Sequence, residues 1–291
     1  MKISIVTDEI SSDLETALEL AAGMDVRDIE LRGYGSRRVP LYSDYQKQRV
    51  KELLEEYNAR VVAISPGLFK IPFPPSKREG FPVQVIDSDQ YKRWRDARSL
   101  VRYHLNELLP ASIEYANEIG AQKVICFGFD RGGAPAGPAP DEVLEALNSA
   151  AGKAALNELD LLIEVEAGFW ADSGERTAEL VRKIGQPALG INWDPGNSIE
   201  TGELPYPAGY QAAREYIRHV HFKDVVRGES GNFRYEINGE IDWVGQVNAL
   251  ERDGYQGYIS VEPHMTPKVS SVRKLSDRLK ELIAAATAVH S

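Results

Sequence analysis

Short apolar runs alternate with segments of helical periodicity along the chain. Each run is rich in Val, Ile, Leu or aromatic residues, ends in polar or turn residues and has the length of a β-strand. The eight runs are ISIVTDE (3–9), DIELRG (28–33), RVVAISPG (60–67), KVICFGF (123–129), LLIEVE (161–166), LGINWD (189–194), RHVHFKD (218–224) and GYISVEP (257–263). This alternation is typical of an α/β protein.

Apolar residues recur at helical spacing between these runs. The clearest such segments are 14–23, 45–59, 142–159, 176–185 and 272–289. Strand and helix alternate eight times, the number that closes a (β/α)8 barrel of about 250 residues. No internal repeat, flexible linker or heptad run marks a second domain. The sequence therefore predicts a single (β/α)8 TIM barrel over residues 1–291.

The third unit is longer than the others and extends from about residue 68 to residue 122. It holds a Pro-rich loop at 70–82 and a long helical segment that we expect to be interrupted before Pro110. An insertion of this kind is expected on the rim of a barrel.

Composition narrows the function. The formal net charge of −10 disfavours nucleic acid, because an acidic chain repels polyphosphate. A single cysteine, Cys126, excludes an internal disulfide framework and suits a reducing compartment. The apolar run after Lys2 is shorter than a signal core or a membrane span. We therefore expect a cytoplasmic protein with neither a membrane nor a nucleic-acid partner.

Side-chain parity sorts the polar residues of the last four strands. In a barrel, alternate side chains of a strand face the helices and the lumen. Leu161, Ile163 and Val165 share one face of the fifth strand, and Glu164 and Glu166 share the other. By the same rule, the inward residues of the sixth to eighth strands are Asn192, Asp194, His219, His221, Lys223, Ser260 and Glu262.

Several of these inward residues stand at the C-terminal ends of their strands, where barrel enzymes place their active sites. Carboxylates gathered in a narrow lumen repel one another and are poorly solvated, at a cost of several kcal/mol per ion. A bound cation removes this difficulty. Carboxylates from Asp194, Glu262 and either Glu164 or Glu166, together with the His221 imidazole, suit Mn²⁺, Mg²⁺ or Co²⁺, with Zn²⁺ as an alternative.

At these residues the chain resembles the xylose isomerase-like barrels, which include sugar phosphate isomerases, epimerases and related dehydratases. The matching segments are IELR (29–32), IEVEAGFW (163–170), WDPGN (193–197), HFKD (221–224), NGEIDW (238–243) and GYQGYISVEP (254–263). They follow one another in the order of the strands and span most of the chain.

The resemblance implies one divalent metal, Mn²⁺ before the other candidates, held by Glu164, Asp194, His221 and Glu262. It also implies that Glu164 and Glu262 act as an acid/base pair. Chelation of a carbonyl and its neighbouring hydroxyl acidifies the C–H bond between them and stabilises an enediolate. The expected function is isomerisation or epimerisation of a small sugar, sugar phosphate or related hydroxy-carbonyl compound.

Further positions are expected to contact this polyhydroxy substrate. Arg227 lies six residues after His221, which resembles an arginine of the family's epimerases that contacts substrate hydroxyls. Glu30 and Arg32 resemble the family's inward pair on the second strand. The remaining predicted substrate contacts are Glu166, Asn197 and Lys223.

Other functions stay open at this point. Asn197 and Trp170 depart from the family's ketose 3-epimerases, which leaves the reaction less determined than the site. A dehydratase of a keto-inositol or a dehydroshikimate-like acid is the main alternative. An endonuclease IV-like nuclease would need more than the five histidines of this chain. A sugar-binding barrel without activity is the third alternative, and any of these functions allows a homo-oligomer.

Overall fold

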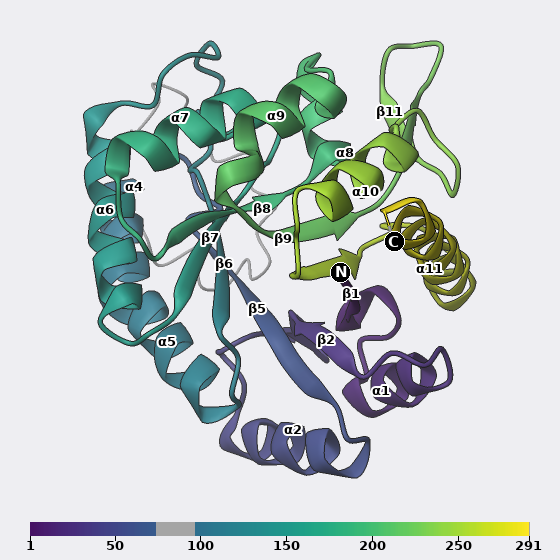
Figure 1. Ribbon diagram of the computed structural model, residues 1–291. Coiled ribbons are helices and arrows are strands. Elements are labelled where there is room, and N and C mark those ends of the chain that lie inside the picture. The colour runs from purple at the N-terminus through teal and green to yellow at the C-terminus, as the bar shows by residue number, and fades with distance from the viewer. Residues whose placement is uncertain (74–96, 291) are drawn as a thin grey trace.

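Eight parallel strands form a closed barrel at the centre of the molecule, as seen in the computed structural model, which describes residues 1–73 and 97–290 (Figure 1). The strands are β1 (Lys2–Val6), β2 (Asp28–Leu31), β5 (Arg60–Leu68), β6 (Lys123–Phe127), β7 (Asp160–Glu164), β8 (Leu189–Trp193), β9 (Ile217–Phe222) and β12 (Tyr258–Val261). The first and last strands close the barrel by parallel pairing from Lys2 beside Tyr258 to Ile5 beside Val261. The predicted (β/α)8 barrel is confirmed, and each strand falls on one of the eight predicted runs.

Helices surround this barrel on its outer side (Figure 1). The longer ones are α1 (Leu14–Ala22), α2 (Asp44–Glu56), α4 (Ala97–Tyr103), α5 (Leu109–Glu118), α6 (Asp141–Ala155), α7 (Gly174–Ile184), α10 (Trp243–Arg252) and α11 (Lys268–His290). Two short helices, α8 (Pro195–Ser198) and α9 (Tyr210–Ala213), follow β8. Across the described ranges, no helix combines the length and apolar character that crossing a membrane requires.

Local sequence explains where several helices begin and end. Ser43 and Gln46 form a capping box at the start of α2, in which each side chain bonds the backbone N–H of the other residue. Ser173 caps α7 through the backbone N–H of Arg176. Gly185 ends α7 in the left-handed conformation at φ 66°, which glycine adopts without steric cost.

The helical segment of the third unit differs from the prediction at Pro110. The chain stays helical through this residue, because a π-helical turn (His104–Leu108) joins α4 to α5. Proline lacks the N–H of the regular ladder, and its ring clashes with the carbonyl four residues before it. The wider turn, closed by the Leu109 N–H on the His104 carbonyl, accommodates proline without a break. Residues 74–82 of the predicted Pro-rich loop lie outside the described residues.

The two faces of the barrel strands have different chemistry. Outward residues such as Ile163 and Trp193 belong to the apolar core between strands and helices. The lumen instead holds a polar column of fully buried residues, Ser4, Ser260 and His219, joined by hydrogen-bond contacts of 2.6 and 2.9 Å. The predicted parity of the strands is therefore confirmed, and its polar side leads to the C-terminal end of the barrel.

Candidate metal centre and active site

Four side chains converge where β7, β8, β9 and β12 end. Glu164 is the last residue of β7, Asp194 and Glu262 directly follow β8 and β12, and His221 is the second-last residue of β9. All four are buried, with at most 5% of each residue exposed. One potential ligand atom from each lies within 4.8 Å of the others. The barrel therefore gathers the four predicted metal ligands in one place.

His221 is the centre of this group. Its Nδ1 atom lies 3.2 Å from Glu262 Oε2, 3.6 Å from Asp194 Oδ2 and 3.8 Å from Glu164 Oε1. Among the described residues this buried nitrogen has no hydrogen-bond partner. A buried nitrogen without a partner is costly, whereas a neutral imidazole nitrogen beside three carboxylates can coordinate a divalent metal. The residues present thus fit the metal that the family resemblance implies.

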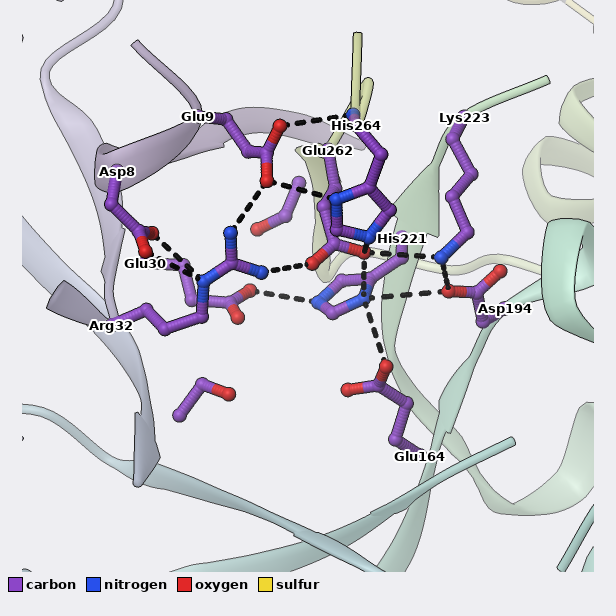
Figure 2. A network of polar contacts seen from close by, with 12 residues as sticks. Asp8, Glu9, Glu30, Arg32, Glu164, Asp194, His221, Lys223, Glu262 and His264 are labelled. Atoms are coloured by element: carbon purple, nitrogen blue, oxygen red, sulfur yellow. Dashed lines mark hydrogen bonds and ion pairs between the residues drawn. The ribbon is translucent and has the colours of Figure 1, made fainter. Parts of the chain in front are cut away.

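The other ring nitrogen of His221 is held from behind by Glu30. Figure 2 shows the Glu30 carboxylate directed at the His221 ring. Glu30 Oε2 lies 3.0 Å from His221 Nε2 and 3.0 Å from His219 Nε2. Burial alone would raise the pKa of Glu30, but His221 and His219 outweigh it and lower the pKa. An ionised carboxylate at Nε2 fixes the imidazole with Nδ1 toward the cluster. Glu30, predicted as a substrate contact, instead occupies a position that orients a ligand.

Lys223 is a cation inside the cluster. Its ammonium lies 2.7 Å from Asp194 Oδ2 and 3.2 Å from Glu262 Oε2, and only 1% of the side chain is exposed. Asp194 Oδ2 nevertheless has no contact of hydrogen-bonding geometry among the described residues. Lys223 therefore offsets part of the negative charge of the cluster. Gly196 makes room for it, because a Cβ atom there would lie 2.8 Å from Lys223 Cγ.

Arg32 connects Glu262 of the cluster to the acidic residues that follow β1. Figure 2 shows its guanidinium between Asp8, Glu9 and Glu262, at 2.8 Å from Asp8 Oδ1, 2.5 Å from Glu9 Oε1 and 2.5 Å from Glu262 Oε1. His264 completes the arrangement, with Nδ1 2.9 Å from Glu9 Oε1 and Nε2 3.3 Å from Glu262 Oε2. These contacts hold Glu262 in one orientation.

The two glutamates of the cluster have opposite electrostatic surroundings. Burial raises the pKa of Glu164 to about 7, with Glu262 and Glu166 acting in the same direction. Burial also acts to raise the pKa of Glu262, but His264, Lys223 and His221 outweigh it and bring this pKa well below its usual value. One carboxyl group therefore accepts a proton near neutral pH, and the other stays ionised.

A cavity of about 430 Å³ opens above the cluster. Its walls are formed by Arg32, Arg38, Ser65, Lys70, Phe127, Glu164, Glu166, Ala167, Asn197, Glu200, Lys223, Tyr235, Glu262 and His264. Four of the six residues predicted to contact substrate are in this set, namely Arg32, Glu166, Asn197 and Lys223. The volume suits a small molecule.

Glu166 belongs to the cavity wall and not to the ligand group, which separates it from Glu164. Its carboxylate lies 3.0 Å from Lys70 Nζ and accepts a hydrogen bond of 3.0 Å from Asn197 Nδ2. The Asn197 amide also donates to the Val165 carbonyl at 2.9 Å. These contacts hold Glu166 and Asn197 in place facing the cavity.

Arg227 lies apart from this cavity. It ends β10 (Val225–Arg227), which pairs with β11 (Phe233–Tyr235) in an exposed hairpin. Its guanidinium lies 4.7 Å from the centre of the Phe233 ring. Arg227 is absent from the cavity lining, and its contact with substrate stays a prediction.

Several residues of the site were not predicted from the sequence. Arg38, Lys70 and Tyr235 reach the cavity from a hairpin or a loop, where strand parity gives no direction. Glu9 lies in a short 3₁₀ helix after β1. His264 could have been predicted to lie at the site, because it stands two residues after Glu262.

The chain belongs to the xylose isomerase-like TIM barrel family, since the model of that family matches residues 18–282. The Mus musculus protein named "Putative hydroxypyruvate isomerase" is 27% identical over 191 residues. That match covers 58% of this chain and 63% of the mouse protein, which is less than two thirds of its length.

Solved structures share the fold over almost the whole chain. An L-ribulose 3-epimerase superposes with a TM-score of 0.71 at 17% identity, covering 100% of this chain and 97% of that one. A xylose isomerase-like TIM barrel protein from Mycobacterium smegmatis, in complex with magnesium, gives a TM-score of 0.68 at 14% identity and covers 94% and 88% of the two chains. At these identities the likeness establishes the fold.

Proposed function

We propose that this protein is a divalent-metal-dependent isomerase or epimerase of a small hydroxy-carbonyl compound. The observation that carries the proposal is the Nδ1 atom of His221, which has no hydrogen-bond partner in the part of the chain that the structure describes and faces three buried carboxylates at the end of the cavity. Membership of a family with isomerase and epimerase relatives supports the same class.

Glu164, Asp194, His221 and Glu262 would hold the metal. When bound there, a divalent cation polarises a carbonyl and its neighbouring hydroxyl and so acidifies the C–H bond between them. The oxygen-rich donor set suits Mn²⁺, Mg²⁺ or Co²⁺, with Zn²⁺ as an alternative.

The two glutamates supply the proton transfers. Glu262, kept ionised by its cationic neighbours, is suited to remove a proton from the substrate carbon. Glu164, whose pKa is raised to about 7 chiefly by burial, is suited to deliver a proton near neutral pH. Return of the proton to the neighbouring carbon gives an isomer, and return to the other face of the same carbon gives an epimer.

The direct test combines metal binding with hydrogen exchange. Metal-free protein is titrated with Mn²⁺ by calorimetry, and ketoses, keto-inositols and hydroxypyruvate are then incubated with the Mn²⁺-loaded protein in D₂O and followed by NMR. We expect one Mn²⁺ per chain and deuterium incorporation beside the carbonyl of at least one compound. Mn²⁺ binding without exchange on any compound would overturn the proposed reaction.

Two matched variants locate the activity. Glu262→Gln removes one carboxylate of the cluster, whereas Glu55→Gln removes an exposed one on the outer helix α2. Exchange is expected to be lost in the first variant and kept in the second. Equal exchange in both variants would show that the reaction does not take place at this site.

Dehydration is the second candidate, and His264 is the observation that favours it. Burial acts to lower the pKa of His264, but Glu262 outweighs this effect and raises the pKa to about 9. A protonated imidazole on the cavity wall can protonate a departing hydroxyl group after Glu262 has removed the carbon-bound proton. Formation of an enone that absorbs in the ultraviolet would distinguish this reaction from isomerisation.

A further inference from the structure

Arg38 lines the cavity from β4 (Arg37–Arg38), the second strand of a hairpin with β3 (Gly33–Tyr34). Its Nε atom donates a hydrogen bond of 2.6 Å to the Ser65 carbonyl, and its Nη2 atom donates one of 3.0 Å to Ser65 Oγ. Ser65 is buried within β5. The guanidinium is therefore held rigidly by the barrel wall before any ligand binds.

The other cationic side chains of the cavity wall are each matched by a carboxylate. Those pairs join Arg32 to Asp8, Glu9 and Glu262, Lys70 to Glu166, Lys223 to Asp194 and Glu262, and His264 to Glu9 and Glu262. Arg38 has no carboxylate partner among the described residues. Asp8, Glu164 and Glu262 act on its charge from a distance, but in the described part of the chain none of them forms an ion pair with it.

A guanidinium carries five N–H donors, of which Arg38 spends two on Ser65. Burial, together with repulsion from Arg32, lowers the pKa of Arg38 to about 10, so the group remains charged near neutral pH. Arg38 is partly exposed on the cavity wall, where an anionic ligand can supply the ion-pair partner that the described residues do not. Its three remaining donors, in the cavity that holds the candidate reaction centre, therefore suit an acceptor of negative charge.

We propose that Arg38 binds a carboxylate of the substrate, so that the substrate is a small hydroxy-keto acid and not a neutral sugar. This inference rests on the proposed function, because it assigns the substrate class of the same cavity. A planar carboxylate matches the planar guanidinium and can accept two parallel hydrogen bonds from it. A phosphate ester carries about −1.5 to −2 charges, which the carboxylates on the same wall, Glu164, Glu166, Glu200 and Glu262, would repel more strongly.

Three compounds with the same three-carbon hydroxy-ketone skeleton test the assignment. Hydroxypyruvate ends in a carboxylate, dihydroxyacetone in a neutral hydroxymethyl group and dihydroxyacetone phosphate in a phosphate ester. Deuterium exchange in D₂O is measured for each with the Mn²⁺-loaded protein, and kcat/KM is compared. We expect hydroxypyruvate to be preferred over both of the others.

Arg38→Gln removes the charge, and Arg38→Lys keeps the charge while losing the planar fork. Arg37→Gln is the matched control, because Arg37 is the exposed neighbour on the same strand and bonds the Leu41 carbonyl. In Arg38→Gln the preference for hydroxypyruvate over dihydroxyacetone should fall by about 30-fold or more, through loss of charge-assisted hydrogen bonds. The preference of Arg38→Lys should lie between those of Arg38→Gln and the wild type. Arg37→Gln should keep the wild-type preference within about twofold, as is usual for a substitution of an exposed residue.

Binding without turnover separates this inference from the proposed function. Calorimetry of the Mn²⁺-loaded protein with D-glycerate and with glycerol should show binding of D-glycerate that weakens in Arg38→Gln and not in Arg37→Gln. If this pattern holds while no compound undergoes exchange, the proposed reaction fails and the carboxylate site stands.

Three results would overturn the assignment itself. The first is an unchanged preference in Arg38→Gln, or in Arg38→Lys if the glutamine variant does not fold. The second is a wild-type preference for the phosphate ester that depends on Arg38. The third is binding of D-glycerate that is equal in the wild type and the Arg38 variants.

Discussion

Glu262 and Glu164 are two glutamates of one cluster, and their neighbours give them different properties. Glu262 lies within 3.3 Å of cationic groups from Arg32, Lys223 and His264. Glu164 has His221 at 3.8 Å as its nearest ion-pair partner among the described residues, and its Oε2 accepts a hydrogen bond of 3.3 Å from Asn192 Nδ2. Identical side chains at equivalent strand ends thus differ in charge state because the barrel surrounds them differently.

This difference separates an acid from a base within one site. A buried carboxyl group with few cationic neighbours holds its proton to higher pH, whereas one surrounded by cations stays ionised. Four changes, from the largest expected effect to the smallest, test whether the two glutamates differ in this way.

The largest effect is expected on activity when either glutamate is neutralised. Glu262→Gln and Glu164→Gln each remove a proposed metal ligand and proton-transfer group, and each should lower deuterium exchange by about 10³-fold or more. The measurement is exchange at saturating Mn²⁺. A variant that retains exchange within tenfold of the wild type would show that its glutamate takes no part in proton transfer.

The next effect is a pH dependence of stability that belongs to Glu164. Burial raises the pKa of Glu164 from its ordinary value of 4.5 to about 7 in the folded protein, so between these pH values the folded state binds a proton that the unfolded chain does not. The stability of metal-free wild type relative to Glu164→Gln should therefore fall as pH rises from 4.5 to 7, by about 3 kcal/mol. Urea unfolding of both proteins over this range measures it, and a constant difference would contradict the raised pKa.

The third effect concerns the stability of the Glu262→Gln variant, which should change in the opposite direction to the stability of Glu164→Gln. Glu262→Gln leaves Arg32 and Lys223 each with one carboxylate fewer and should destabilise the metal-free protein by about 2 kcal/mol at pH 7. Glu164→Gln removes a buried charge that has few cationic neighbours and should stabilise the metal-free protein at pH 7. Urea unfolding midpoints with unchanged slopes report both changes, and equal shifts would remove the distinction between the two residues.

The smallest effect is expected at Glu30, which contacts His221 and lies outside the four-ligand group. Glu30→Gln weakens the hold on His221 Nε2 and should lower Mn²⁺ affinity about tenfold. Calorimetric titration gives the value. His219→Gln is an informative companion, because His219 contacts Glu30 but lies outside the four-ligand group, and its effect on affinity should be smaller.

Much of the architecture could be predicted from periodicity alone. The eight strands follow runs of β-branched and aromatic residues, and their parity places Asp194, His221 and Glu262 on the lumen side at one end of the barrel. Parity could not separate Glu164 from Glu166, which point the same way. The family resemblance favoured Glu164, and the structure groups that residue with the other three.

Other features depend on contacts that no local pattern records. Glu9 and His264 are 255 positions apart in the chain, and Arg32 and Glu262 are 230 positions apart, yet each pair is in contact because β1 closes the barrel against β12. Pro110 was expected to interrupt a helix, but the π-helical turn before it keeps the chain helical.

The sequence by itself determined the order of strands and helices, the inward face of each strand and the residues that can ligate a metal. Those properties follow from periodicity and residue type, which are local. Only the tertiary structure decided that Glu262 is surrounded by cations, that burial raises the pKa of Glu164 to about 7 and that Arg38, within the described part of the chain, lines the cavity without a carboxylate ion-pair partner. Charge state and ligand recognition depend on neighbours brought together across the closed barrel, and the spacing of residues along the chain does not specify those neighbours.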